Sequence, residues 1–96
     1  MKLILSAEAE RNFANTKAYI KSEWSEKSAQ KFSAQVFKCL LKISQYPEMY
    51  PYFSKPRLIR RSKASRHTII FYRVNKDVIE VLALKDERQD ASKFKF

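Results

Sequence analysis

Four short segments of the chain, rich in apolar and β-branched residues, are predicted to be β-strands, in which successive side chains point to opposite faces. They are Lys2–Ser6, Arg57–Arg61, Arg66–Val74 and Val78–Leu84. In the first segment, Ile4 lies on the face opposite Leu3 and Leu5. Asn75, between the last two segments, tolerates the positive φ of a tight turn, so these two are predicted to form a β-hairpin.

Two longer segments repeat their apolar residues every three or four positions, which is the period of an amphipathic helix. The first runs from Ala7 to about Glu23 behind Ser6 as N-cap, and the second runs from Ser25 to about Gln45. The short turn between them predicts an antiparallel pair. The predicted buried positions are Ala9, Phe13, Thr16, Ile20 and Trp24, then Ala29, Phe32, Val36, Leu40 and Ile43, widened by Phe37, Cys39 and Leu41.

Prolines separate the helices from the later strands, and Pro47–Lys55 is predicted to be an irregular aromatic connection that covers one end of the core. The order β-α-α-β-β-β predicts an α+β fold, in which a helical hairpin packs on one face of a small antiparallel sheet. The N-terminal strand is expected at an edge of this sheet or between distant strands. Ninety-six residues are enough for one domain, residues 1–96.

The composition excludes several classes of function. The chain has no glycine, so it has no P-loop and no dinucleotide-binding fingerprint, and it has one cysteine and one histidine, so no usual metal cluster is expected. We therefore expect no cofactor and no metal. No apolar run is long enough for a signal peptide or a membrane span, which predicts a cytosolic protein without membrane contact. The net charge of +10 favours an acidic partner.

The basic residues are concentrated between Lys55 and Arg73, where the chain has no acidic residue. The candidates for target or anion binding are Arg57, Arg60, Arg61, Lys63 and Arg66, with Arg88 beyond the last strand. Guanidinium groups that converge in this way bind phosphates and carboxylates, although a solvated face would have the same composition. Arg88 has two interpretations, a functional residue or an ion-pair partner of Asp86 or Asp90.

No nucleophile–base–acid set is visible in the sequence. His67 is the one histidine, and it is either a structural residue at a strand start or a general acid or base. Cys39 and Trp24 are predicted to be core residues. Phe71 and Tyr72 are candidates for base stacking, but they alternate along a strand, so at least one belongs to the core.

In their order and spacing, several motifs resemble the RelE/ParE superfamily of toxins from type II toxin–antitoxin modules, and the ParE branch most of all. These motifs are Leu5-Ser6-Ala7, Tyr19-Ile20, Trp24, Ala29 with Phe32, Tyr46-Pro47-Glu48-Met49, Arg60-Arg61, His67–Val74, Val78–Leu84 and Arg88-Gln89-Asp90. The resemblance implies a cytosolic toxin held in a hetero-oligomer by a cognate antitoxin. ParE-type relatives poison DNA gyrase, whereas RelE-type relatives cleave mRNA in the ribosome.

RelE-type cleavage uses basic strand residues, an arginine after the last strand, and a tyrosine or a histidine–tyrosine pair. Arg88 matches that arginine and Arg60 a basic strand residue, but Phe94 stands at the tyrosine position and Ile69 at another arginine position. Neither side chain can move a proton or stabilise a pentavalent phosphate. The resemblance therefore favours gyrase inhibition by binding. The alternatives are an mRNA endonuclease that uses Arg60, Arg61, His67 and Arg88, and a non-toxic binding scaffold.

The antitoxin is expected to bind an exposed apolar surface. Leu82 and Leu84 of the last strand, together with Phe94 and Phe96, are the candidate residues for this contact. The alternative is that the C-terminal segment folds back and covers this surface.

Overall fold

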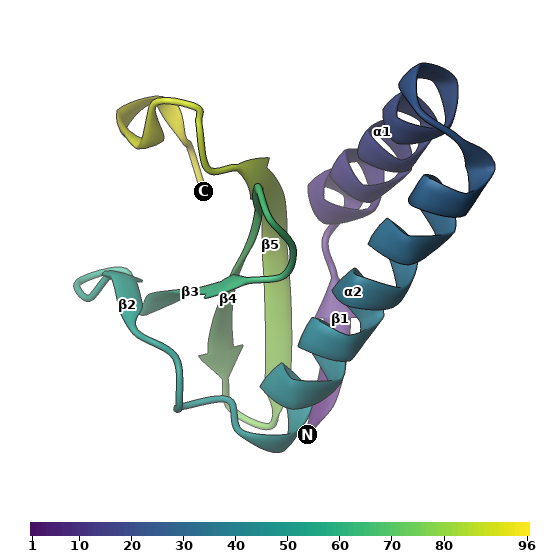
Figure 1. The fold of residues 1–96 in the computed structure, drawn as a ribbon. Helices are drawn as coiled ribbons and strands as arrows, with labels where there is room; N and C mark the ends of the chain where they lie inside the picture. The colour runs from purple at the N-terminus through teal and green to yellow at the C-terminus, as the bar shows by residue number, and fades with distance from the viewer.

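The structure, a computed structural model, describes residues 1–96 and has two layers, a helical hairpin and a five-stranded sheet (Figure 1). In chain order the elements are β1 (Lys2–Leu5), α1 (Ala7–Glu23), α2 (Glu26–Gln45), β2 (Tyr52–Ser54), β3 (Ile59–Lys63), β4 (Thr68–Asn75), β5 (Val78–Asp86) and a 3-10 helix η1 (Ala91–Lys93). Both helices cover one face of the sheet, and the predicted α+β fold is confirmed (Figure 1). Neither helix is long and apolar enough to cross a membrane.

The sheet order is β1-β5-β4-β3-β2, so the two edges are β1 and β2. β1 pairs parallel with β5, and the other neighbours pair antiparallel. The N-terminal strand therefore joins at an edge, which is one of the two positions that were expected. β2 is a short strand inside the connection that was predicted to be irregular, and it pairs with the start of β3.

Both helices begin where the sequence predicts, because serine side chains cap them. Ser6 Oγ accepts a hydrogen bond from the Ala9 amide at 3.0 Å, and Ser25 Oγ accepts one from the Ser28 amide at 3.0 Å. The predicted burial of Trp24 is wrong, since this residue is 77% exposed. It follows the last residue of α1 and has left the helical φ and ψ, so it no longer continues the buried stripe.

The five predicted core positions of α2, from Ala29 to Ile43, are all buried, and so is Cys39. Phe37 and Leu41 are exposed instead, which contradicts their predicted place in the core. Each lies one residue beyond a buried position, and one residue turns a helix by about 100°. The buried stripe is therefore narrower than the sequence pattern indicated.

The strands of the second half differ from their predicted bounds at the turns. β3 starts two residues later than predicted because Leu58 adopts a positive φ of 59° in the turn that ends the Pro56 segment. In the β4–β5 hairpin the residue with positive φ is Lys76, at 57°, and not Asn75. Asn75 remains in β4 and pairs with Val78, so the turn consists of Lys76 and Asp77.

The sheet separates two apolar clusters. The larger one lies under the helices and contains residues from α1, α2, β4 and β5, including Phe32, Ile43 and Tyr72. The smaller one lies on the other face, which we call the outer face, and consists of Ile59, Ile69 and Phe71 with further residues packed around them. β4 supplies both clusters by strict alternation, as its sequence predicted.

Candidate functional site

The basic residues of β3 point to both faces of the sheet. Arg60 pairs with Tyr72 in the register of β3 and β4, and Tyr72 belongs to the cluster under the helices. Directly paired residues share a face, so Arg60 points to the helix side and its neighbour Arg61 points to the outer face. The predicted basic surface is thus divided into two parts with different surroundings.

Arg60 is already occupied by contacts within the protein. Its Nη1 donates hydrogen bonds to the carbonyl oxygens of Glu48 at 3.1 Å and Tyr50 at 2.7 Å, and its Nη2 donates to Tyr52 Oη at 3.0 Å. The guanidinium carbon also lies 4.0 Å from the centre of the Tyr52 ring, a cation–π contact. This arginine holds the connection between α2 and the start of β2, so Arg60 is not a free cation, and its role in anion binding stays a prediction.

The other basic residues of the segment differ in how free they are. Arg57 Nη2 donates to the Phe96 carbonyl at 3.0 Å, and Lys63 Nζ forms an ion pair with Glu87 Oε2 at 3.2 Å. Arg61 and Arg66 are exposed and form no ion pair. These two guanidinium groups are available to bind an anion.

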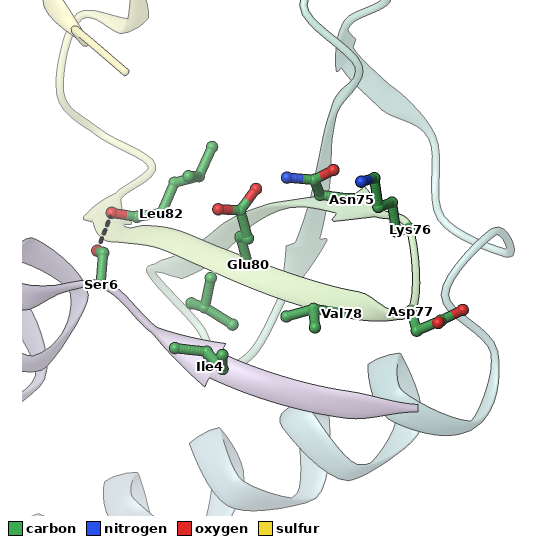
Figure 2. Close-up of a pocket in the computed structure, with 9 residues that line it drawn as sticks. Ile4, Ser6, Asn75, Lys76, Asp77, Val78, Glu80 and Leu82 are labelled. Atoms are coloured by element: carbon green, nitrogen blue, oxygen red, sulfur yellow. Dashed lines mark hydrogen bonds between the residues drawn. The ribbon is translucent and has the colours of Figure 1, made fainter.

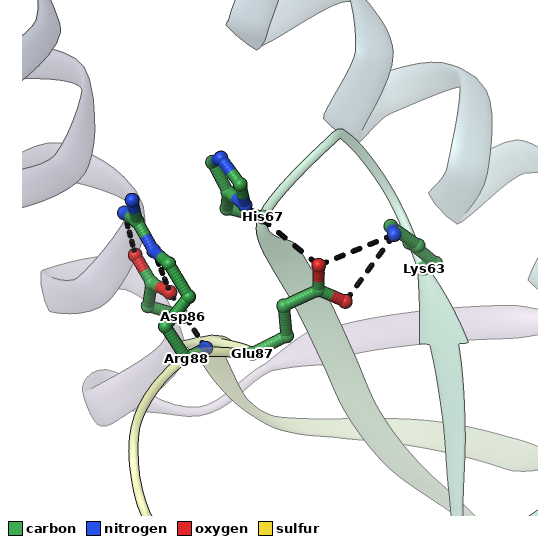
Figure 3. Close-up of polar contacts among 5 residues, drawn as sticks. All are labelled: Lys63, His67, Asp86, Glu87 and Arg88. Carbon is green, nitrogen blue, oxygen red and sulfur yellow. Dashed lines mark hydrogen bonds and ion pairs between the residues drawn. The ribbon is translucent and has the colours of Figure 1, made fainter.

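A polar cluster forms where β5 ends and β4 begins (Figure 3). Glu87 accepts from Lys63 Nζ through both carboxylate oxygens, at 3.3 and 3.2 Å. His67 Nδ1 is buried without a hydrogen-bond partner and lies 3.7 Å from Glu87 Oε1, which is beyond hydrogen-bond distance. The backbone amide of Glu87 donates to the His67 carbonyl at 2.7 Å, and this bond fixes the two residues side by side.

Arg88 is paired with Asp86, which was one of its two predicted interpretations. Its Nε donates to Asp86 Oδ1 at 2.9 Å and its Nη2 to Oδ2 at 2.6 Å, while the Arg88 amide donates to Oδ1 at 2.9 Å. These hydrogen bonds from Arg88 lower the pKa of the Asp86 carboxyl to about 2, and the same contact raises the pKa of Arg88. The cluster therefore pairs each of its two strong cations with a carboxylate.

The polar cluster brings together His67 and Arg88, but not Arg60 or Arg61. Arg60 is at the other end of β3, where it binds the connection after α2. An RNA-cleaving site needs cations that stabilise the transition state and groups that transfer protons. In the polar cluster the two cations, Lys63 and Arg88, are each paired with a carboxylate, and Phe94 packs in the aromatic cluster of the outer face instead.

The C-terminal segment folds back over the outer face (Figure 1). The ring centres of Phe94 and Phe96 lie 5.5 and 5.0 Å from that of Phe71, and Phe53 lies 4.9 Å from Phe71. Both terminal phenylalanines remain half-buried. The alternative in which this segment covers the apolar face is therefore the one observed.

Leu84 is 4% exposed and packs under the helices, so its predicted exposure beside Leu82 is wrong. The reason is a bulge in β5: Tyr72 pairs with Val81 while Phe71 pairs with Ala83, so Leu82 is an extra residue. The bulge reverses the alternation, so Leu84 faces the helices as Val81 does, while Leu82 stays on the outer face.

Beside the aromatic cluster, the outer face has a groove of about 540 Å³ that the C-terminal segment leaves open (Figure 2). Its apolar wall consists of Ile4, Val78, Val81 and Leu82, and Ser6 Oγ donates to the Leu82 carbonyl at 2.8 Å at one end. Polar residues of the β4–β5 turn and Glu80 border it (Figure 2). Ile4 and Val78 were not among the predicted site residues, although the alternation had placed Ile4 opposite the core-facing leucines.

A search of curated protein sequences gives no match, but a solved structure and a protein family do match this chain. The solved structure of the chromosomal ParDE TA system from P. aeruginosa is similar, with a TM-score of 0.75 and 16% identity over 90% of this chain and 95% of that chain. Residues 3–91 match the family described as the ParE toxin of the type II toxin–antitoxin system parDE. The chain therefore belongs to the ParE toxin family of type II toxin–antitoxin systems.

Proposed function

We propose that this toxin acts in the cytosol by binding DNA gyrase, without cleaving a bond itself, and that a cognate antitoxin neutralises it. The observation that carries the proposal is that Arg60 and Arg88 each bind other residues of the protein itself. Arg60 makes two hydrogen bonds to the α2–β2 connection and one to Tyr52 of β2, and Arg88 is held bidentately by Asp86. The two arginines that a nuclease of the wider superfamily would use thus have structural partners.

The proposed target contact uses the cations that remain free. Arg61 and Arg66 are exposed and unpaired, and they follow each other along β3 and the loop after it. The net charge of +10 attracts an acidic surface, and unpaired arginines add directional hydrogen bonds to carboxylates or phosphates. These two residues are the first choice for mutagenesis.

A supercoiling and cleavage-complex assay with the purified toxin tests the proposal. We expect inhibited supercoiling or accumulated cleaved DNA at micromolar toxin, and weaker inhibition for Arg61→Ala/Arg66→Ala. The matched control is Lys27→Ala/Lys31→Ala, which removes the same charge from α2. Unchanged gyrase activity at micromolar toxin contradicts the proposal, and equal losses in both variants mean that only net charge matters.

The antitoxin contact is proposed for the outer face. Leu82 lines the open groove, and Phe94 and Phe96 form the adjacent half-buried apolar surface. An antitoxin segment with apolar anchors and acidic flanks would match both the apolar wall and the positive net charge. We expect Leu82→Arg to weaken antitoxin binding by about tenfold or more, and Leu41→Arg, on the exposed side of α2, to leave it unchanged. The reverse result would place the contact on the helices.

A ribosome-dependent endonuclease is the second candidate, and one observation favours it. His67 Nδ1 is buried, unpartnered and 3.7 Å from Glu87, an arrangement that a small rearrangement would convert into a general base with its orienting carboxylate. New 5′ ends in primer extension on ribosome-bound message, lost in His67→Ala, would support it. Growth arrest without such ends favours gyrase, and no arrest at all favours a non-toxic scaffold.

A further inference from the structure

A second cleft lies on the helix side of the sheet, between α2 and the C-terminal end of β3. The proposed function does not use this cleft. Its volume is about 470 Å³, within the range of clefts that bind small molecules. The lining residues are Gln35, Lys38, Cys39, Lys42, Tyr50, Ser62, Lys63 and Ala64. They include three lysines and no carboxylate, although one of the lysines, Lys63, is paired with Glu87 outside the lining.

Two of the three ammonium groups are free. Lys38 and Lys42 are one turn apart on the same side of α2, are exposed, and form no ion pair. The Nζ of Lys63 is held by Glu87 at 3.2 Å, so this residue contributes mainly its backbone and stem. The positive charge of the cleft therefore comes from the α2 pair.

The floor of the cleft is polar, neutral and buried. Cys39 is 7% exposed and Ser62 is 4% exposed, and the Cys39 thiol lies 3.2 Å from the Ser62 hydroxyl. Burial raises the pKa of the Cys39 thiol, so the thiol stays protonated at neutral pH and adds no negative charge. Gln35 and Tyr50, which also line the cleft, add groups that donate or accept hydrogen bonds.

We propose that the α2–β3 cleft binds a phosphate ester no larger than a nucleotide, with its phosphate between Lys38 and Lys42. Lysine ammonium groups bind phosphate as point charges, and two of them one helical turn apart match the charge of a phosphate monoester. The chain has no glycine and so lacks a backbone phosphate loop, which leaves side chains to make this contact. The proposal is independent of gyrase binding, since the cleft is on the face opposite the open groove.

Titration of the full-length protein with ATP, followed by calorimetry and by amide chemical shifts, tests the proposal. We expect saturable one-to-one binding with shifts at Gln35, Lys38 and Ser62, and Lys38→Ala/Lys42→Ala should weaken it by about tenfold or more. The control Lys27→Ala/Lys31→Ala removes the same charges at the same spacing from the same helix, outside the cleft, and should bind as the wild type does.

Further ligands identify the group that is recognised. AMP should bind and adenosine should not, because the phosphate is the proposed anchor. A short single-stranded oligonucleotide should not bind more tightly per site than ATP. Equal losses in the two double variants, binding of adenosine, or absence of saturation with ATP would each overturn the proposal. If Lys38→Ala/Lys42→Ala does not fold, Lys38→Gln/Lys42→Gln keeps the helix-forming side-chain length and is used with the same criteria.

Discussion

The two faces of the sheet are covered in different ways. On the helix side, α1 and α2 bury a continuous cluster that includes Phe32, Val36 and Tyr72. On the outer face, three buried residues are covered by a C-terminal segment whose phenylalanines remain half-buried. Beyond Asp86 this segment is attached to the body of the protein by Phe94, Phe96 and few polar contacts, among them Arg57 to the Phe96 carbonyl. One face is a core, and the other is a surface with a partial cover.

This difference separates stability from recognition. The cluster under the helices has 11 buried residues and the outer cluster has 3, so we expect the helix side to contribute more of the hydrophobic free energy of folding. A segment held by two half-buried rings and a few polar contacts is expected to open at lower cost than the core does. The outer face also holds the open groove and the side chain of Arg61, so the proposed antitoxin contact and part of the proposed gyrase contact lie on the face with the partial cover.

The largest effect is expected for a substitution on the helix side. Phe32→Ala removes a buried ring that stacks on Phe13 at 5.7 Å, and should lower the free energy of unfolding by about 3–5 kcal/mol. The control Phe37→Ala changes an exposed phenylalanine of the same helix and should cost less than about 1 kcal/mol. Urea unfolding at neutral pH measures both. Similar losses in the two variants would show that the helix side is not the dominant core.

Arg60 and Arg61 are neighbours in β3 that face opposite sides of the sheet, so substituting each one in turn compares the two faces. Arg60→Ala should cost about 1.5–3 kcal/mol, since it removes hydrogen bonds from a charged donor to Glu48, Tyr50 and Tyr52. Arg61→Ala should change stability by less than about 0.5 kcal/mol, because its exposed side chain forms no ion pair. Thermal and urea unfolding distinguish these outcomes, and a toxicity loss in Arg61→Ala alone would assign function to the outer side. Equal stability losses contradict the division.

The caps and the central stripe of the helices could be predicted from the sequence, whereas the pairing of the strands could not, for a physical reason. Ser6 and Ser25 act locally as caps, and the α2 stripe repeats with one period, so both could be inferred from neighbouring residues. The bulge at Leu82 depends on pairing with β4, and no residue within β5 marks it. The division of Arg60 from Arg61 also required the register of the sheet.

The partners of the site residues could be predicted only as alternatives. The pairing of Arg88 with Asp86 was one of two interpretations, because a spacing of two residues allows contact without requiring it. The three acceptors of Arg60 lie eight to twelve residues earlier, two of them in the irregular connection after α2 and one at the start of the short strand β2, and no periodicity describes this segment. The groove residues Ile4 and Val78 come from strands that are adjacent only in the folded sheet.

The next smaller loss of stability is expected when the C-terminal cover of the outer face is removed. Phe94→Ala/Phe96→Ala should cost about 1–2 kcal/mol, less than one buried phenylalanine of the helix side, because both rings are half-buried. It should also expose Phe71 and Phe53, which increases the fluorescence of a dye that binds apolar surfaces. A loss as large as that of Phe32→Ala would mean that the segment is part of the core. Unchanged dye binding would mean that it does not cover the face in solution.

The smallest effect concerns Asp86, which fixes the point where the C-terminal segment leaves β5. Its pKa of about 2 in the folded protein is below the usual 3.8, so the folded state favours the carboxylate. The contribution to stability is therefore complete above pH 3.8 and is lost as the pH falls through about 2. Because the Asp86 side chain is 36% exposed, solvent limits this contribution to less than about 1 kcal/mol.

Asp86→Asn keeps an oxygen that accepts from Arg88 but removes the charge, so it isolates the ion pair. The variant should be less stable than the wild type at about pH 5 to 7, and the difference should disappear at about pH 2. Urea unfolding at pH values from about 2 to 7 measures this difference. Asp77→Asn makes the same change at a carboxylate without an ion pair and should show no such convergence. A constant difference at every pH would mean that Asp86 acts through its hydrogen bonds alone, and the exit of the segment from the sheet would then not depend on charge.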